Sequence, residues 1–389
     1  MSRRIAVVTT SRADYSHLYW VLRDLDAHPS VELKLIATGA QLSPEFGTAV
    51  REIEYDGFTI DERVECLLSS DTDVGMAKTI GIATLGLAEA LGRMRPNLLL
   101  LIADRYEMLA PASVALALRI PIAHIEGGEV SEGAIDDAVR NALTKMSHLH
   151  FVPTENAKRR VIAMAEEPWR VHRTGAPSLD HLVRNTMVPR GKLQQELGVS
   201  LKDDAILVAY HPVTLARDTL YEADALFGAL ERVSGQVLFC FPNADAGSRE
   251  LYDRATAFCD SRNDAHLFVN LHPLRYWSLL HCASVMLGNS SSGIMESPSL
   301  MLPCVNVGTR QRGRERAANI LDADPTADAI VEALQRAQTS DFKRSLDGMV
   351  NPYGDGSAAK QIVETLASTE LGERLLIKRA VPVHDGHHA

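Results

Sequence analysis

Short apolar runs alternate with amphipathic segments along almost the whole chain, and this alternation constrains the fold more than any other feature. Strands that are buried on both faces of a parallel sheet read as continuous apolar runs, and helices between them cover those faces. The first half of the chain has such runs at 5–10, 32–38, 97–103, 120–125 and 149–153. The sequence therefore predicts an α/β fold built from parallel βαβ units.

The pattern pauses near residues 180–200 and then restarts, which indicates a second domain. The second half has apolar runs at 205–212, 236–243, 266–270, 285–290 and 303–308. A chain of 389 residues is also too long for one typical core. We predict two Rossmann-like, doubly wound domains, 1–180 and 181–350, followed by a tail at 373–389. Ligands of such sheets bind beyond the carboxyl ends of the strands, so we expect the active site in the interdomain cleft.

Charge and composition narrow the class of partner. The chain has 40 basic and 50 acidic residues and a net charge of −10, which argues against nucleic acid or an anionic membrane as a partner. No GxGxxG motif follows the first predicted strand, so a dinucleotide cofactor is disfavoured. The five cysteines are widely spaced, which favours reduced thiols and no metal site.

Two apolar segments are candidates for an export signal or a membrane span, but neither has the expected features. The N-terminal residues read as a first strand, because polar residues follow the short apolar run at once. The apolar stretch 80–91 is interrupted by Glu89 and is too short to span a bilayer. We therefore expect a cytoplasmic protein.

Polar and charged side chains follow several strands of the first predicted domain. Arg12 and Ser16 lie just beyond the first strand, where they could bind an anion or belong to an ordinary helix start. Asp104 ends an apolar run with Arg105 beside it, as a site carboxylate or as a structural ion pair. The stretch "HIEGGEVSEGAIDD", 124–137, places five carboxylates and three glycines after another strand. These groups predict an active-site mouth in the first domain.

The strand ends of the second predicted domain carry groups that suit a phosphate or diphosphate. His211 follows one strand, and "GNSSSGIMES", 288–297, offers hydroxyl and amide donors between glycines, with Glu296 able to bind sugar hydroxyls. Arg310, Arg312 and Arg314 gather after a further strand in an otherwise acidic chain, and arginine suits phosphate. Carboxylates facing a bound diphosphate suggest acid–base chemistry on a sugar with departure of a nucleotide.

Nine motifs in the same order resemble the hydrolysing UDP-N-acetylglucosamine 2-epimerases, above all the bacterial sialic-acid and legionaminic-acid pathway type. They are "SRADYS", "LSPEFG", "SDTDVGMAKTIG", "DRYEMLAPA", "HIEGGEVSEGAIDD", "TKMSHLHF", "HPVT", "GNSSSGIMES" and "GTRQRGRE", between residues 4 and 365. The resemblance implies a glycosyltransferase-B-like fold in which a last helix, 356–372, returns to the first domain. It also implies a homodimer or dimer of dimers, a nucleotide-sugar substrate, and no cofactor.

The resemblance implies a reaction and a set of site residues. The expected reaction converts UDP-N-acetylglucosamine and water to N-acetylmannosamine and UDP through a glycal, for nonulosonic acid synthesis. Motif by motif, the implied catalytic acids are Asp104, Glu126 and Asp136. The implied nucleotide- and substrate-binding residues are Arg12, Ser16, Gln41, Arg105, His211, Ser290, Ser291, Glu296 and Arg310.

Three positions depart from the pattern of the resembled family. Ala103 stands where glycine is usual, a change that we expect to be tolerated if φ is negative. Gln41 stands where many relatives have histidine, and His17 where lysine is common. Because Gln41 cannot titrate, a proton transfer assigned to that position elsewhere must move or vanish here.

Four alternatives remain open at the level of sequence. The sugar could be a UDP- or GDP-linked 2,4-diacetamido-2,4,6-trideoxy hexose, and the enzyme could be a non-hydrolysing epimerase that returns the nucleotide to C1. The fold would also suit a glycosyltransferase or a catalytically idle nucleotide-sugar sensor. The sequence does not decide which carboxylate is the base.

Overall fold

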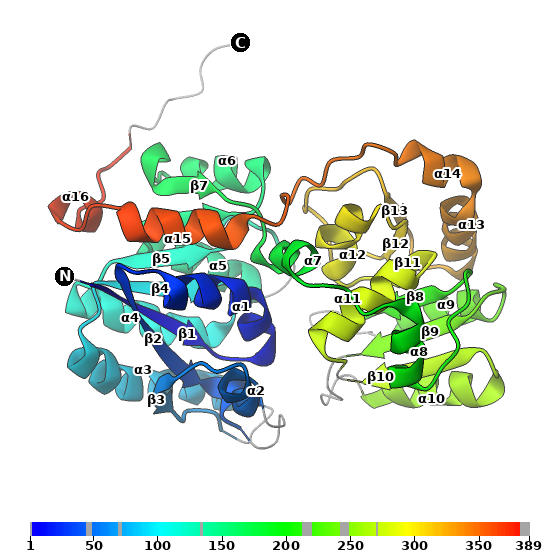
Figure 1. Cartoon of the computed structure of the whole chain (residues 1–389), viewed down its shortest axis with the longest axis horizontal. Coiled ribbons are helices and arrows are strands. Elements are labelled where there is room, and N and C mark those ends of the chain that lie inside the picture. The colour runs from blue at the N-terminus through cyan, green and yellow to red at the C-terminus, as the bar shows by residue number, and fades with distance from the viewer. Residues whose placement is uncertain are drawn as a thin grey trace, which may run out of the picture. The chain divides into compact units, whose positions relative to one another are not determined.

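The chain forms two compact units, each with its own parallel sheet (Figure 1). The computed structural model describes residues 2–43, 49–68, 72–132, 135–211, 220–241, 249–269 and 271–381. Unit 1 comprises Met1–Glu129, Ile135–Asp180 and Gly356–Ala389, and unit 2 comprises Val130–Ala134 and His181–Asp355. The predicted α/β class is confirmed, and the helix expected at 356–372 falls in unit 1.

The described part of unit 1 contains a seven-stranded sheet in the order β3-β2-β1-β4-β5-β6-β7. The strands are β1 (Arg3–Thr9), β2 (Val31–Thr38), β3 (Ile60–Val64), β4 (Leu98–Ile102), β5 (Ile122–Ile125), β6 (Leu149–Val152) and β7 (Val171–Arg173). Every residue of β4, Leu-Leu-Leu-Leu-Ile, is buried, as a central parallel strand requires. The five predicted strands are confirmed, whereas the edge strands β3 and β7 were not predicted.

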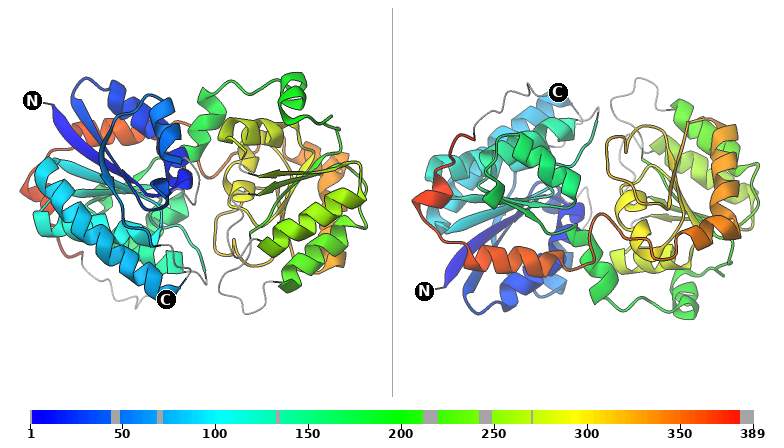
Figure 2. Two further views of the ribbon diagram at one scale, coloured as in Figure 1. Left: turned by 90° about the horizontal axis from the view of Figure 1, so that it is seen from below. Right: turned by 90° about the horizontal axis from the view of Figure 1, so that it is seen from above.

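Helices cover both faces of this sheet, as Figure 2 shows. They are α1 (Arg12–Ala27), α2 (Ala49–Tyr55), α3 (Asp73–Met94), α4 (Leu109–Leu118), α5 (Ile135–Met146), α6 (Glu155–Ala163), α15 (Ala358–Ser368) and α16 (Glu373–Leu376). A further helix, α7 (Asp180–Arg184), begins at Asp180 of unit 1, and its other residues belong to unit 2. α15 packs beside α1, far away in sequence. The Asp180 carboxylate accepts from the backbone N–H groups of Ala358 (3.0 Å) and Ala359 (3.2 Å), which fixes the start of α15.

The helix α3 is longer than the apolar stretch 80–91 suggested. It has 22 residues and is, within the described residues, the one helix long and apolar enough to cross a membrane by length and composition. Its buried side chains, among them Ala83, Leu87 and Leu91, belong to the core of unit 1. The expectation that this segment is too short for a span was therefore wrong, and the helix instead packs on the sheet.

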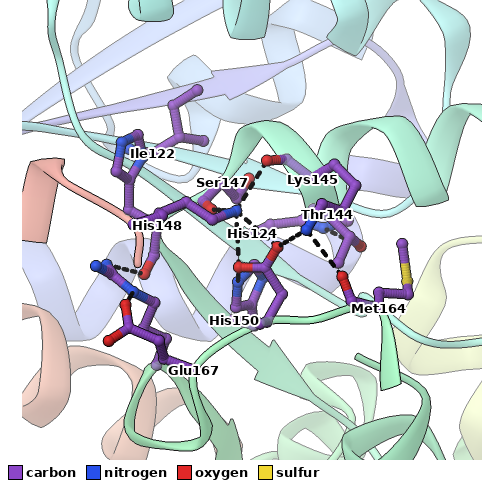
Figure 3. A network of polar contacts seen from close by, with 12 residues as sticks. Ile122, His124, Thr144, Lys145, Ser147, His148, His150, Met164 and Glu167 are labelled. Carbon is purple, nitrogen blue, oxygen red and sulfur yellow. Dashed lines mark hydrogen bonds and ion pairs between the residues drawn. The ribbon is translucent and has the colours of Figure 1, made fainter. Parts of the chain in front are cut away.

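A buried polar network holds residues 374–378 against the rest of unit 1, where β6 and β7 begin (Figure 3). The Glu166 carboxylate is fully buried and binds Lys145 Nζ at 2.6 Å, Lys378 Nζ at 2.7 Å and His150 Nε2 at 3.2 Å. The buried Arg170 guanidinium donates to the backbone carbonyls of Arg374, Leu375 and Ile377. The first residues of the predicted tail are thus packed, and residues 382–389 lie outside the described residues.

The described part of unit 2 contains a six-stranded sheet in the order β10-β9-β8-β11-β12-β13. The strands are β8 (Ile206–Ala209), β9 (Val237–Phe241), β10 (Ala265–Val269), β11 (Val285–Gly288), β12 (Cys304–Val307) and β13 (Ile320–Ala323). The helices are α8 (Arg190–Leu197), α9 (Leu220–Leu230), α10 (Arg249–Ser261), α11 (Pro273–Cys282), α12 (Ser292–Met295), α13 (Ala327–Gln338) and α14 (Ser340–Ser345). Alternate residues of β8 enter opposite cores, one under α9, α10 and α13 and one under α8 and α11.

Candidate active site

Two neighbouring strands of unit 1, β4 and β5, end in residues with left-handed backbone conformation. Ala103 after β4 has φ 58°, and Glu126 after β5 has φ 65°. The Ala103 N–H donates to Ile125 O (3.0 Å), and the Glu126 N–H donates to Phe151 O (2.8 Å). These bonds continue the ladder to the turn, so the chain reverses sharply there and presents Asp104 and Glu126 at the same sheet edge. The condition under which we expected alanine to be tolerated at position 103, a negative φ, is not met.

The helix α5 brings the third predicted acid to this edge. Arg140 of α5 is 3% exposed and forms an ion pair with Asp104. Thr144, one turn later, has its hydroxyl 3.5 Å from His124 Nδ1. Asp136 precedes Arg140 by four residues, so it lies on the same face of α5, in the first turn. Asp104 and Glu126 therefore lie at the carboxyl ends of β4 and β5, and Asp136 shares a face of α5 with Arg140, the partner of Asp104.

His124 supports this arrangement from inside the sheet. Its Nε2 lies 2.8 Å from the carbonyl oxygen of Ala103, so this nitrogen carries the proton and donates. Complete burial lowers the pKa of His124 to about 4, and the imidazole is neutral at physiological pH. The ring thus ties the end of β5 to the left-handed turn after β4.

The two glycines after Glu126 serve the packing of the protein itself. A Cβ on Gly127 would lie 3.2 Å from His124 Nδ1 and 3.1 Å from Thr144 Oγ1. Gly128 has φ 77°, and a Cβ there would lie 2.4 Å from the carbonyl oxygen of Ala157. Close contact with β5, α5 and α6 requires them.

His17 reaches this edge from the second turn of α1. Its Nδ1 lies 3.0 Å from Glu126 Oε1. The sequence marked His17 as a departure from the family pattern but did not connect it with Glu126, because 109 residues separate the two. The pair links the start of α1 to the end of β5.

The predicted cations of unit 1 each pair with a carboxylate of the same unit. Arg12 Nε lies 3.1 Å from Glu52 on α2, and Arg105 Nη2 donates to Glu107 at 2.8 Å. Glu107 is fully buried. Its carboxylate helps to raise the pKa of Arg105, although burial of the guanidinium opposes that shift. An anionic ligand would compete with both carboxylates for these arginines.

Gln41 and Ser16 lie near the ends of β1 and β2. Gln41 is 1% exposed, its N–H donates to Thr10 O (2.9 Å), and its side-chain amide has no hydrogen-bond partner among the described residues. Ser16 is half-buried on α1, next to His17. Asp14 accepts from the Thr10 N–H (3.0 Å), while Ser11 caps α1.

In unit 2, the buried side chain of Asn289 joins the ends of β8 and β11. It accepts from the His211 N–H (2.7 Å) and donates to the His211 carbonyl (2.8 Å). The Asn289 carbonyl in turn accepts from Arg310 Nη1 (3.0 Å) and from Gln311 Nε2 (2.8 Å). We had expected Asn289 to donate to a ligand, but both ends of its side-chain amide already bind His211. Its role is to place His211 and Arg310 together.

Two further residues at the junction of β8 and β11, Gly288 and His211, have properties that suit their positions. Gly288 has φ 141°, and a Cβ there would lie 2.0 Å from Ala209 O, so no larger residue fits. Burial, together with the nearby Arg310, lowers the pKa of His211 to about 3, so the imidazole is neutral. A neutral imidazole beside a guanidinium suits a hydrogen bond to a phosphate oxygen.

The serine-rich turn, which contains Ser290 and Ser291, is followed by only a short helix. α12 is a single turn, Ser292–Met295, so its dipole contributes little at Ser290 and Ser291. The Ser290 hydroxyl accepts from the Ser292 N–H at 3.4 Å, and Glu296 is buried directly after α12. Of the three predicted arginines, Arg310 donates to Asn289 O at the junction, whereas Arg314 donates to Val130 O (3.1 Å) and Arg312 is exposed.

Comparison with known proteins identifies the family. Residues 23–367 match the family described as UDP-N-acetylglucosamine 2-epimerase. The chain belongs to the UDP-N-acetylglucosamine 2-epimerase family. The family predicted from the nine motifs is thus confirmed.

Relatives of this epimerase include enzymes named for a diacetamido sugar. The hydrolysing UDP-N,N'-diacetylbacillosamine 2-epimerase of Legionella pneumophila is 36% identical over 97% of this chain and 99% of its own length. The hydrolysing GDP/UDP-N,N'-diacetylbacillosamine 2-epimerase of Campylobacter jejuni is 35% identical over 93% of this chain and 94% of its own. The UDP-GlcNAc 2-epimerase of Methanocaldococcus jannaschii, solved with UDP-GlcNAc and UDP, shares the fold with a TM-score of 0.79. It is 17% identical and covers 94% of this chain and all of its own.

Within the epimerase, the structure groups the predicted residues by unit. Unit 1 carries the three acids with Arg12, Ser16, Gln41 and Arg105, and unit 2 carries His211, Ser290, Ser291, Glu296 and Arg310. Sequence reasoning did not predict that Arg140, Glu107 and Asn289 position these groups. The spacing of four residues between Asp136 and Arg140 was a signal for the first. Among the described residues, no group of three histidine, cysteine or acidic side chains is arranged to hold a metal ion.

Proposed function

We propose that this epimerase is a hydrolysing 2-epimerase of a UDP-linked N-acetylated amino sugar, and that its sugar is a 2,4-diacetamido-2,4,6-trideoxy hexose. The observation that supports the reaction class is that two acids, Asp104 and Glu126, follow the neighbouring strands β4 and β5, and we propose that Asp136 of α5 joins them. The names of the relatives from Legionella and Campylobacter favour the diacetamido sugar. UDP-N-acetylglucosamine, the first expectation from the sequence, is the second candidate.

The proposed reaction needs two proton transfers at one carbon. A carboxylate removes the proton from C2 while the C1–O bond to the nucleotide breaks, which gives a glycal and the nucleoside diphosphate. Water then adds its oxygen to C1 and gives one of its protons to a carboxylate, and an acid delivers a proton to C2 on the opposite face. The products are the free 2-epimerised sugar and the diphosphate, and two or three carboxyl groups around the ring meet this requirement.

Electrostatics around Asp104 and Glu126 suit different roles for these carboxyl groups. Asp104 has a buried cationic partner, Arg140, whereas Glu126 has a histidine partner that exchanges protons. Two carboxyl groups in unlike surroundings can hold unlike protonation states at one pH. We therefore propose that Arg140 holds Asp104 as a carboxylate before each turnover, and that Glu126 is one of the two groups that exchange a proton with C2.

The nucleotide is proposed to bind unit 2. Arg310 and neutral His211 would donate to the diphosphate, the hydroxyls of Ser290 and Ser291 would add hydrogen bonds, and Glu296 would accept from sugar hydroxyls. Arg12, Ser16 and Arg105 of unit 1 would contact the substrate from the end of β1 and β4. That the site lies between the two domains, and that the enzyme is cytoplasmic, remain predictions.

Self-association also remains a prediction. Large apolar side chains on α3 and α4 are exposed, including Leu85 (74%), Val74 (57%) and Leu116 (43%). If they form the predicted homodimer contact, Leu85→Glu converts the wild-type species to a monomer in light scattering. An unchanged mass would remove this surface from the prediction.

A substrate panel tests the proposed function. UDP- and GDP-linked N-acetylglucosamine and their diacetamido-trideoxy counterparts are incubated with the wild type, and nucleotide release and product mass are recorded. We expect UDP release fastest from the diacetamido sugar, with a free 2-epimerised product. Release that requires a sugar acceptor would instead indicate a glycosyltransferase, and UDP binding without any turnover would indicate a sensor.

A further inference from the structure

The contact between His17 and Glu126 joins a partly exposed base to a covered acid. The two atoms, His17 Nδ1 and Glu126 Oε1, are 3.0 Å apart, which is hydrogen-bonding distance. The His17 side chain is 29% exposed and that of Glu126 is 11% exposed. The imidazole therefore contacts water on one side and the carboxyl group on the other.

The backbone keeps Glu126 in this place. Its left-handed conformation, φ 65°, is unusual for a glutamate and is held by the N–H bond to Phe151 O at 2.8 Å. His17 is held by α1, whose start is capped by Ser11. Both partners thus sit on ordered elements of unit 1, and the pair does not depend on the placement of unit 2.

Every turnover of the proposed reaction leaves the acids in the wrong protonation state. The group that took the proton from C2 must lose it before the next substrate, and the group that gave a proton must regain one. Both protons exchange with water in the end. A carboxyl group that is largely covered by protein exchanges fastest through a neighbouring group that binds and releases protons itself.

Neighbouring side chains cannot serve this purpose. His124 of β5 is completely buried, and its pKa of about 4 keeps it neutral. Gln41 has an amide that does not titrate, and Arg140 of α5 keeps its proton as a guanidinium while it pairs with Asp104. The other carboxyl groups at this end of the sheet, Asp104, Asp136 and Asp137, are acids like Glu126 itself; Asp104 pairs with Arg140, and Asp137 lies 4.0 Å from the same guanidinium.

We infer that His17 is the group through which Glu126 exchanges its proton with water between turnovers. The inference rests on the proposed function, because that function makes Glu126 change its protonation state. When Glu126 is protonated, its O–H bond breaks and an N–H bond forms at Nδ1 of the neutral imidazole. The resulting imidazolium releases the proton from Nε2 to water. The reverse steps protonate Glu126, so atoms and charge balance in either direction.

The kinetic test uses three variants of histidines in α1 and beside it. His17→Gln keeps a hydrogen-bonding side chain but cannot titrate, and His17→Ala removes the side chain. His28, which follows the last residue of α1 and hydrogen-bonds to Ser30, gives the matched control His28→Ala. We expect kcat for nucleotide release to fall at least about tenfold in both His17 variants, with KM within about threefold. We expect no change in His28→Ala.

Added imidazole separates proton exchange from a structural role. We expect millimolar imidazole to raise kcat of His17→Ala severalfold and to leave His17→Gln unchanged, because the glutamine side chain fills the space. Wild-type kcat in His17→Gln would overturn the inference. So would a loss in His17→Ala that imidazole does not relieve.

A second measurement needs no turnover, so it also applies if the proposed function fails. In wild type labelled at the histidine rings, NMR follows the His17 signal against pH, with His17→Gln identifying the signal. Because a neighbouring carboxylate favours the imidazolium, Glu126→Gln should shift the midpoint of the His17 titration to lower pH. An unchanged midpoint would show that the two groups do not share a proton and would overturn the inference. Absence of turnover in the wild type, by contrast, would overturn the proposed function.

Discussion

Arg140 pairs with Asp104 from inside the protein: the guanidinium is 3% exposed, and the carboxylate that it binds directly follows β4. Removal of Asp104 therefore has two effects, because it takes away a site carboxylate and leaves a buried cation without this partner. We expect Asp104→Asn to lower kcat for nucleotide release by roughly 10²- to 10⁴-fold and to destabilise the fold by on the order of 1–3 kcal/mol. A nucleotide-release assay measures the loss of activity, and urea unfolding measures the loss of stability.

The exposed pair Arg344–Asp341 provides the control for Asp104→Asn. Asp341 is 89% exposed, and exposed pairs contribute about 0–1 kcal/mol. Asp341→Asn should therefore change neither activity nor unfolding. Turnover of Asp104→Asn within twofold of wild type would remove Asp104 from the proposed mechanism.

Because Ala103 has a left-handed conformation, we predict that a smaller and a larger residue at this position change the stability of the fold in opposite directions. Ala103→Gly relieves a strain of about 1–2 kcal/mol but adds freedom to the unfolded chain, so we expect stability between unchanged and about 1 kcal/mol higher. Ala103→Val should destabilise by more than about 1 kcal/mol. Thermal unfolding measures both.

Ala165 offers a matched position for the Ala103 pair of variants. It has φ 63°, is exposed and lies away from the acids. Ala165→Gly should change stability in the same direction as Ala103→Gly and leave kcat unaffected. If Ala103→Val is as stable as the wild type, the left-handed turn after β4 is not required.

The buried histidines predict loss of stability in mild acid. Burial lowers the pKa of both His124 and His148 to about 4, below the value of about 6.5 in an unfolded chain. Their folded forms are neutral, so the unfolded state binds more protons between pH 6.5 and 4, and stability falls as pH drops through this window. The two together should lower the free energy of unfolding by on the order of 3 kcal/mol between pH 7 and pH 5.

The network around Glu166 extends this dependence to lower pH. Although burial of the carboxyl group opposes the shift, His150, Lys145 and Lys378 lower the pKa of Glu166 to about 2. Its contribution is therefore retained to about pH 4.5 and lost below it. Urea unfolding at a series of pH values measures both phases, and a free energy independent of pH between 7 and 5 would contradict the buried histidines.

Replacement of Asn289 should lower both the stability of unit 2 and its affinity for UDP. Asn289→Ala removes two hydrogen bonds to the backbone of His211 and leaves buried groups unpaired, which costs about 2–4 kcal/mol of stability. Because Arg310 donates to the backbone carbonyl of Asn289, we also expect UDP to bind more weakly by about tenfold or more, as measured by calorimetry. Asn306→Ala is the control, since Asn306 pairs with Asp322 away from this junction. Equal UDP affinity in wild type and Asn289→Ala would contradict the assignment of the nucleotide to this junction.

The sequence predicted central strands well and edge strands poorly, for a physical reason. β4 is buried on both faces and reads as five apolar residues, whereas β3, Ile-Asp-Glu-Arg-Val, is exposed at its charged positions. β7 and β13 are also short edge strands with polar residues. An edge strand is paired on one side only, so its sequence carries little of the apolar signal.

The sequence predicted the acids of the site but not the residues that pair with them. Asp104 and Glu126 directly follow apolar runs, and that position is visible in the sequence. The contacts of Glu126 with His17, and of Arg170 with residues 374–377, join segments more than 100 residues apart. Their pairing depends on the order of strands in the sheet, which the apolar pattern does not give. The left-handed φ of Ala103 was missed because alanine is common in both helices and strands.

Isotope incorporation tests the central claim, hydrolysis with epimerisation at C2, most directly. The enzyme is incubated with the UDP-linked diacetamido sugar in H₂¹⁸O, and in D₂O in a parallel reaction, and the sugar product is analysed by mass spectrometry and NMR. We predict one ¹⁸O at C1, one deuterium at C2 and inverted configuration at C2, with unlabelled UDP released. Unlabelled C1, or a product that keeps its C2 proton and configuration, would contradict the account.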